Sequence, residues 1–331
     1  MYRERRLIRI GFTVFVLIGL LGIEFGVCSA AERKPLTWGT TASTSGVFPY
    51  YVFTAKMLNE SIPEINITVR ATGGGIFNMR AMQKGEIDIG SCPTANSWEV
   101  VKGKGPFEGK PFPDIRLLYV IMTNGLQMAV SEKSGVKTLK DLEGKKFCPG
   151  QLGGGIEQYV KEIFQILGIK PDLRFMSMAD SIEAMKDERI VGIAKMGVPD
   201  ASLLDISSAM KIRILSFTDA ELDKVVNNLM GLTKAEFPAG VYPGTTPFKT
   251  LANEWSDFVR NDFPADIAYK IVKTLWERRA EIKKMDGRFV GDKMWDVTLG
   301  VKTNSLHPGV IKFCREQKLT VPANLVPPEM K

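Results

Sequence analysis

Two glycine-rich turns contain the residues best suited to chemistry in this sequence. The first, Thr72 to Gly75, follows an expected strand, Ile65 to Ala71, and leads directly into a helical pattern. The second, Pro149 to Ile156, also stands between an expected strand and an expected helix. The first amides of a helix lack intrahelical partners and carry the positive end of the helix dipole, and glycine lets a ligand approach them. The two turns therefore predict a site for a carboxylate or another anion.

A run of hydroxyl residues supplies a third polar turn. Thr41 to Gly46 follows an expected strand, Lys34 to Gly39, and precedes an expected helix, Phe48 to Ile62. Such hydroxyls bind anions or cap helices, so an anion site and a solvated capping loop both remain open. Lys195, at the end of the expected strand Val191 to Met196, is the best candidate for a charged partner, although a solvated lysine is the commoner outcome.

Few other residues support catalysis. The only histidine, His307, stands in a Leu-His-Pro-Gly turn, so most hydrolase arrangements and all multi-histidine metal sites are excluded. We expect it to bond to nearby backbone. Cys92, Cys148 and Cys314 match no zinc or redox spacing, and we expect them to be buried, reduced thiols. No metal, no cofactor and no enzymatic activity are expected.

Strand and helix patterns alternate along the chain. The order strand, helix, strand, helix, strand in residues 34–90 indicates a largely parallel sheet whose strand ends face a ligand. Further strands are expected at 115–123, 127–131, 145–148, 191–196 and 212–216, and further helices at 137–142, 156–167, 180–187, 201–210, 251–261, 265–285 and 308–317.

The length of the chain suits two lobes. It has 331 residues, of which 44% are hydrophobic and 24% charged. We expect it to cross to a second lobe near Ala129 to Glu132 and to return through the proline-rich segment Pro238 to Pro247. The predicted fold class is α/β, with mixed, mostly parallel sheets. The first lobe is expected at 32–129 and 245–331, the second at 130–244, and a ligand between them.

Residues 1–31 have the layout of a secretory signal peptide. Arginines precede an apolar run, Gly11 to Ile23, and small residues follow, with cleavage expected near Ala30 or Ala31. A retained membrane anchor fits so short a run less well. Acylation of Cys28 is a further alternative. The mature protein is expected to be periplasmic.

The charge of the chain fits a small anionic ligand. Removal of residues 1–31 takes away four arginines and two glutamates, so the net charge falls from +7 to about +5. The basic residues are scattered singly rather than clustered with aromatic residues, and no nucleic-acid partner is indicated. A mildly positive field helps to attract an anion.

Seven motifs, in this order and spacing, resemble the TAXI solute-binding proteins of TRAP transporters across essentially the whole mature chain. They are Thr41-Ala42-Ser43-Thr44-Ser45-Gly46, Thr72-Gly73-Gly74-Gly75 with Asn78, Gly85-x-x-Asp88, Asp141-Leu142-x-Gly144-Lys145, Pro149 to Gly155, Gly240-x-Tyr242, and Leu306-His307-Pro308-Gly309. The resemblance implies a type II periplasmic binding-protein fold. It also implies closure of two lobes about hinge strands onto a carboxylate such as glutamate or 2-oxoglutarate, and delivery of the ligand to TRAP membrane permease subunits.

The resemblance also implies the ligand contacts. The first lobe contributes Thr41, Ser43, Thr44, Ser45, Gly46, Phe48, Thr72, Gly73, Gly74, Gly75 and Asn78; the second contributes Gly150, Gln151, Gly153, Gly154, Gly155, Ile156, Lys195 and Gly197; and Tyr242 is the closing aromatic residue. This chain has Gly153-Gly154-Gly155-Ile156 where relatives often carry Gly-Ser-Gly-Thr. Gly75 replaces a usual serine, and Phe48 stands where tyrosine is frequent. Hydroxyl donors are lost, so a less polar or larger carboxylate than glutamate is expected.

Three rival functions remain open on the sequence. The first is that of a binding protein of the same fold that serves an ABC importer for sulfonates or thiamine-type precursors. An enzyme of related fold, such as a transferase or deaminase, would use the cleft, but no nucleophile, base and orienting acid assemble around His307. A sensor lobe of a membrane kinase is the third.

Overall fold

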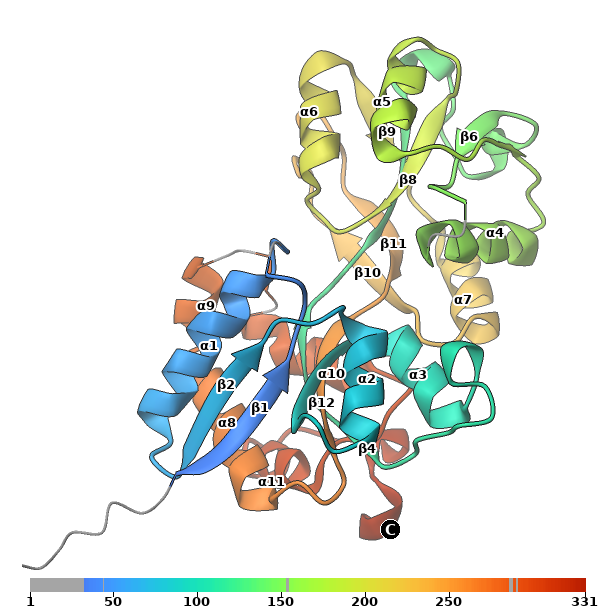
Figure 1. The fold of residues 1–331 in the computed structure, drawn as a ribbon. Coiled ribbons are helices and arrows are strands. Elements are labelled where there is room, and N and C mark those ends of the chain that lie inside the picture. The colour runs from blue at the N-terminus through green and yellow to red at the C-terminus, as the bar shows by residue number, and fades with distance from the viewer. Residues whose placement is uncertain (1–32, 44, 153–154, 286–287, 290) are drawn as a thin grey trace, which may run out of the picture. The chain divides into compact units, whose positions relative to one another are not determined.

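The computed structural model describes residues 33–43, 45–152, 155–285, 288–289 and 291–331 (Figure 1). The expected signal peptide and Cys28 lie outside this part of the chain. Among the described residues, no helix combines the length and the apolar character that a membrane crossing requires.

A first five-stranded sheet has the order β2-β1-β3-β12-β4. Strand β1 pairs in parallel with β2 and β3, and β12 pairs antiparallel with β3 and β4. The strands are β1 (Lys34–Gly39), β2 (Ile65–Arg70), β3 (Ile89–Pro93), β4 (Ile115–Met122) and β12 (Trp255–Arg260). The carboxyl ends of β1, β2 and β3 therefore meet at one edge of the sheet.

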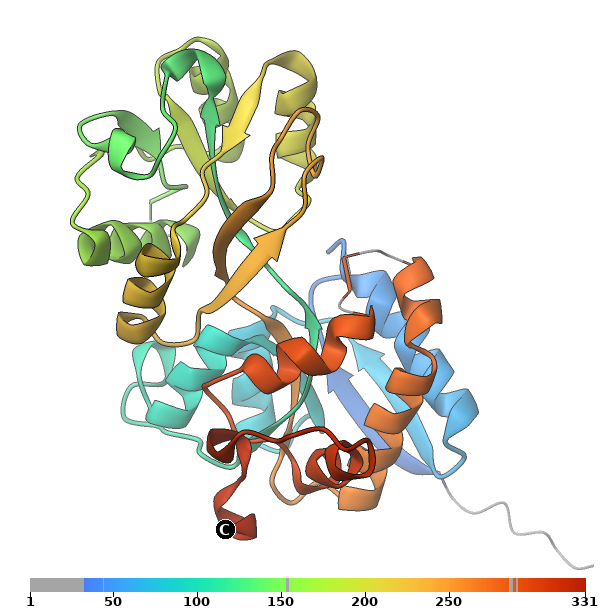
Figure 2. The ribbon, with the colours of Figure 1, turned by 180° about the vertical axis from the view of Figure 1, so that it is seen from behind.

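Helices cover both faces of this first sheet. They are α1 (Phe48–Ser61), α2 (Gly75–Gln83), α3 (Thr94–Lys102), α8 (Ala265–Glu277), α9 (Arg279–Met285), α10 (Met294–Gly300) and α11 (Pro308–Glu316), with short 3-10 turns at η1 (Gly105–Phe107), η4 (Gly291–Lys293), η5 (Ala323–Leu325) and η6 (Pro328–Met330). Helix α2 lies in front of the sheet in Figure 1 and α10 lies in front of it in Figure 2, which is seen from behind. The two helices thus cover opposite faces.

A second five-stranded sheet has the order β7-β6-β8-β5-β9. Strand β6 pairs in parallel with β7 and β8, and β5 pairs antiparallel with β8 and β9. The strands are β5 (Leu126–Ser131), β6 (Lys146–Cys148), β7 (Asp172–Leu173), β8 (Gly192–Met196) and β9 (Ile212–Ile214). The helices are α4 (Gly155–Leu167), α5 (Met178–Lys186), α6 (Ala201–Ala209) and α7 (Asp219–Asn228), with 3-10 turns η2 (Glu132–Ser134) and η3 (Lys140–Leu142). An antiparallel pair, β10 (Thr233–Phe237) and β11 (Phe248–Ala252), follows.

Two crossing segments join the lobes: 123–125 leads from β4 to β5, and 253–254 leads from β11 to β12. They are bonded to each other, because the Asn253 amide donates to the Asn124 carbonyl at 3.1 Å. Gly125 is required here, since a Cβ on it would lie 2.6 Å from the ring of Phe237. The lobe limits expected at 129/130 and 244/245 fall inside β5 and just before β11.

The helix expected over 251–261 is wrong. This stretch forms the end of β11, a crossing segment and the central strand β12. Ser256, Asp257, Phe258 and Val259 are buried, because β3 and β4 flank the strand on both sides. Pairing with two neighbours outweighs the local helical pattern. The single helix expected over 265–285 is likewise two helices, α8 and α9, which separate at Arg278.

The two sheets have separate apolar cores. Cys92, Cys148 and Cys314 are buried and free, as predicted. His307 is buried and precedes α11, where its Nδ1 accepts from the Gly309 amide at 3.2 Å. Its predicted structural role in the turn is therefore confirmed.

Candidate functional site

The first-lobe turns are joined by Thr72 and Asn78. The Thr72 hydroxyl donates to the Thr40 carbonyl and lies 2.7 Å from Asn78 Oδ1, while the Thr72 amide donates to the Thr41 carbonyl at 3.2 Å. Asn78 Nδ2 donates to the carbonyls of Thr40 and Ser91 at 2.7 and 2.8 Å. The polar groups of Asn78 are thus bonded inside the lobe, and the residue is fully buried. It positions the turns.

Helix α2 begins without a side-chain cap. Its N-cap residue, Gly74, has φ +92°, a conformation that favours glycine, and its carbonyl accepts from the Asn78 amide at 2.9 Å. A Cβ on Gly75 would lie 2.7 Å from Pro93 and 2.9 Å from Cys92. Gly73 is exposed and has room for a Cβ. The close packing of Gly75 places the start of the helix against β3.

The hydroxyl loop precedes α1, also without a side-chain cap. Ser45 donates from its amide to Ala42 and accepts from the Phe48 amide, each at 2.9 Å, and Ser43 is exposed. The Gly46 carbonyl accepts from Arg288 Nη2 at 3.0 Å. Thr44 lies outside the described residues. The loop is therefore held from a distant part of the chain by an arginine.

The second glycine-rich turn is described only in part, because Gly153 and Gly154 lie outside the described residues. Gly150 has φ +121° and its Cβ would be 3.7 Å from the Glu157 amide, so the turn folds back on the start of α4. Gln151 is exposed. Gly155 and Ile156 are the first residues of α4, as the sequence predicts within one residue.

The three remaining predicted residues gather within the second lobe. The Tyr242 hydroxyl donates to Gln127 Oε1 at 2.5 Å and accepts from the Asp200 amide at 2.8 Å. Gln127 Nε2 donates to the Gly197 carbonyl, and Lys195 Nζ lies 3.5 Å from Asp200 Oδ2. Tyr242 is fully buried. Gln127 joins this network and was not predicted.

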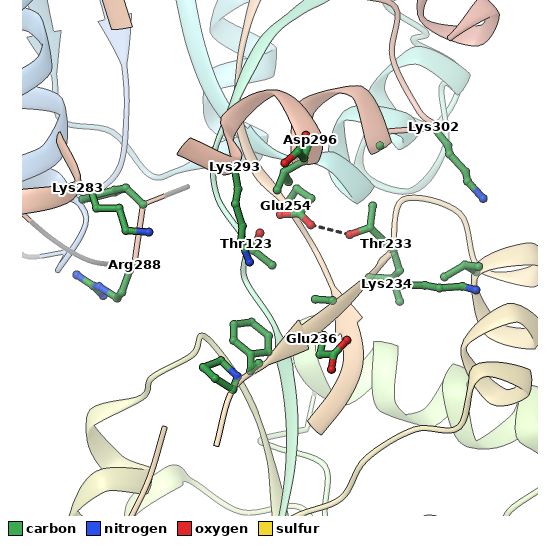
Figure 3. Close-up of a pocket in the computed structure, with 18 residues that line it drawn as sticks. Thr123, Thr233, Lys234, Glu236, Glu254, Lys283, Arg288, Lys293, Asp296 and Lys302 are labelled. Atoms are coloured by element: carbon green, nitrogen blue, oxygen red, sulfur yellow. Dashed lines mark hydrogen bonds between the residues drawn. The ribbon is translucent and has the colours of Figure 1, made fainter. Parts of the chain in front are cut away.

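A cavity of about 590 Å³, here called the crossing cavity, lies beside the crossing segments. It is lined by Thr123, Val226, Leu232, Thr233, Lys234, Ala235, Glu236, Phe237, Pro238, Glu254, Lys283, Arg288, Phe289, Lys293, Asp296, Val297, Gly300 and Lys302. Figure 3 shows Lys283 and Arg288 on one side, Lys234 and Lys302 on the other, and Glu254 between them.

Glu254 is the buried charged group of this cavity. Its side chain is 2% exposed, and Oε1 accepts from the Thr233 hydroxyl at 2.7 Å. Burial raises the pKa of Glu254 to about 7, against the opposing hydrogen bond from Thr233. Near neutral pH the group therefore exchanges readily between carboxylate and carboxylic acid.

None of the predicted site residues that the structure describes lines the crossing cavity. The bond from Arg288 to Gly46 is a direct link between the cavity lining and the hydroxyl loop. Glu254 was not predicted as a site residue because the residues around it have a helical pattern. Its signal in the sequence is an Asn-Glu pair between two short apolar runs, which marks a break between strands rather than a helix interior.

The architecture is a two-lobed α/β fold, with a mixed sheet in each lobe. Three solved structures are similar to this chain. The periplasmic aliphatic sulphonate binding protein SsuA from Escherichia coli is 13% identical with a TM-score of 0.47, over 86% of this chain and 79% of that one. The probable amino-acid ABC transporter extracellular-binding protein ytmK from Bacillus subtilis is 12% identical with a TM-score of 0.49, over 79% and 100%. The L-cystine solute receptor of Neisseria gonorrhoeae is 14% identical with a TM-score of 0.48, over 79% and 95%.

Matches at 12–14% identity and TM-scores below 0.5 say nothing of what this chain does. The sequence match is more specific, since residues 39–317 fit one family from the end of β1 to the end of α11. The chain belongs to the NMT1-like family.

Proposed function

We propose that this protein is an exported solute-binding protein that holds a small organic anion, a carboxylate, between its two lobes. The uncapped start of α2 beside the hydroxyl loop carries this proposal. Helix amides without partners attract anions, and the glycines before them leave room for the ligand. The second-lobe turn at Gly150 would close over the same anion.

Isothermal titration of the exported chain, purified without refolding, tests the ligand class. The panel contains dicarboxylates, keto acids and aromatic acids, with the matching amides as neutral controls. We expect a carboxylate to bind and its amide not to bind. Absence of binding by every acid would refute the proposal.

One substitution tests the location. Gly73→Asp places a negative charge at the start of α2, whereas Gly73→Asn has the same shape without the charge. Because Gly73 has room for a Cβ, both variants should fold. We expect the aspartate variant to lose at least tenfold in affinity through repulsion of the anion, and the asparagine variant to lose much less. Equal losses would place the anion elsewhere.

Two classes of transporter are candidate partners. The sequence resemblance points to a TRAP permease of the TAXI type, whereas one of the similar structures, ytmK, is a probable amino-acid ABC transporter extracellular-binding protein. Uptake measured with the membrane proteins encoded beside this chain separates the two classes. A TRAP partner requires an ion gradient across the membrane, whereas an ABC partner requires ATP hydrolysis.

A further inference from the structure

The crossing cavity is separate from the proposed solute site. Its walls come from both lobes, with β10 on one side and the segment from α9 to α10 on the other. The described residues of the glycine-rich turns are not part of its lining. A volume of about 590 Å³ falls in the range of small-molecule sites.

The Glu254 carboxyl group in this cavity has an oxygen that is free to make a further hydrogen bond. One carboxyl oxygen, Oε1, accepts from Thr233, while Oε2 is buried and makes no hydrogen bond in the described part of the chain, although the Thr123 hydroxyl is near enough to the carboxyl group to lower its pKa. A buried polar atom without a partner is unfavourable, and a ligand that pairs with it removes that cost. The cavity therefore favours an occupant with a polar atom directed at Oε2.

The charges around Glu254 favour an anion over a cation. The positive groups in the lining belong to Lys234, Lys283, Arg288, Lys293 and Lys302, and the negative groups besides Glu254 belong to Glu236 and Asp296. Lys234 pairs with Asp223 at 2.6 Å, whereas Lys283, Lys293 and Lys302 have no ion-pair partner among the residues that the structure describes. These exposed lysines can approach an anion at the mouth of the cavity.

The rest of the lining is apolar. A purely polar ion would make no favourable contact with the apolar walls, which are formed by Val226, Leu232, Phe237, Phe289 and Val297. A carboxylate with a ring or a branched chain matches both parts of the lining.

We propose that the crossing cavity is a second ligand site, which binds a small carboxylate with an apolar body through a hydrogen bond from the protonated side chain of Glu254. A carboxylate ion of Glu254 would repel this ligand, whereas the carboxylic acid donates to it. Binding therefore takes up one proton from solution when Glu254 starts ionised. The raised pKa of Glu254 makes this protonation accessible near neutral pH.

Benzoate is the probe, because it combines a carboxylate with a flat apolar ring. Its affinity for the full exported chain is measured by isothermal titration between pH 6 and pH 9, in buffers of different ionisation enthalpy that report the proton uptake. We expect the affinity to fall by about 100-fold over this range, as Glu254 loses its proton. Benzamide, which lacks the charge, is the neutral control.

Two variants separate Glu254 from its surroundings. Glu254→Gln keeps an oxygen for Thr233 and an N–H donor for the ligand, so it should hold its pH 6 affinity up to pH 9. Glu236→Gln changes an exposed carboxylate of the same cavity and should follow the wild-type decline. Thermal unfolding confirms that each variant is folded.

Three results would overturn the second site: no benzoate binding at pH 6, an unchanged pH decline in Glu254→Gln, or loss of benzoate binding in Gly73→Asp. The last result would place benzoate at the start of α2. Conversely, benzoate binding that depends on Glu254 but not on Gly73 supports the second site even if the proposed solute site fails its own test.

Discussion

The hydroxyl of Tyr242 donates a hydrogen bond of 2.5 Å to the side chain of Gln127, 115 residues earlier in the chain. This bond ties the segment after β10 to β5, the strand that begins directly after the first crossing. Because Tyr242 is fully buried, its ring and its hydroxyl both lie in the interior of the second lobe.

Tyr242→Phe should therefore destabilise the protein. The change removes the donor to Gln127 and the acceptor of the Asp200 amide, and leaves both groups buried without that partner. We expect the free energy of unfolding in urea to fall by roughly 1–3 kcal/mol. Tyr269→Phe is the control, since that hydroxyl bonds to Glu316 at the surface. Solute affinity should not change in either variant; a large loss in Tyr242→Phe at unchanged stability would instead make Tyr242 a ligand contact.

Asn78→Ala should disrupt the joined turns of the first lobe. The Thr40 and Ser91 carbonyls would each lose the bond from Asn78 Nδ2, and the Thr40 carbonyl would keep only the bond from the Thr72 hydroxyl among its side-chain donors. The expected cost is roughly 2–4 kcal/mol in the free energy of unfolding. Asn96→Ala removes an amide that bonds only to the Glu99 side chain and should cost far less. Similar unfolding midpoints for the two variants would show that the turns do not depend on Asn78.

Much of this fold follows from local sequence. The early strands and helices, from β1 to α2, lie within a few residues of their predicted positions, since apolar spacing and glycine turns are local signals. Strand β12 was missed because its identity depends on β3 and β4, which lie far away in the chain. A strand that inserts antiparallel between two strands from distant parts of the chain leaves no pattern in the sequence around it.

The candidate sites divide in the same way. The turns near Thr41 and Thr72 are recognisable because glycine and hydroxyl residues cluster in sequence. The crossing cavity draws Thr123, Glu254 and Lys293 from three distant segments, and only the tertiary fold brings them together. Burial then shifts the protonation of Glu254, and burial cannot be deduced from an Asn-Glu pair alone.

Asp257→Asn should change the dependence of stability on pH. Asp257 is buried in β12, where Oδ1 accepts from Trp38 at 3.0 Å and from Ser91. Burial raises its pKa from 3.8 to about 6, so the folded protein retains a proton that the unfolded chain has lost. The stability from this group is complete below about pH 4 and is lost as the pH rises through about 6, by ~3 kcal/mol in total.

When urea unfolding is followed from pH 4 to pH 7, the stability of the asparagine variant should fall less with rising pH than that of the wild type, by ~3 kcal/mol over this range. Asp205→Asn, at an exposed position of α6, is the control and should keep the wild-type profile. A profile of Asp257→Asn parallel to that of the wild type would assign this contribution to another group.

His307→Asn should reveal the opposite slope. Burial lowers the pKa of His307 from 6.5 to about 4, so between these values the unfolded chain binds a proton that the folded protein does not. The stability from His307 is complete above about pH 6.5 and is lost as the pH falls through about 4, by ~3 kcal/mol in total. Asparagine keeps an acceptor for the Gly309 amide at the start of α11 and has no proton to gain. The slopes of His307 and Asp257 have opposite signs and similar size between pH 4 and 6. Relative to the wild type, we therefore expect stability to fall more steeply with rising pH in His307→Asn and less steeply in Asp257→Asn, whereas parallel profiles for the two variants would contradict both assignments.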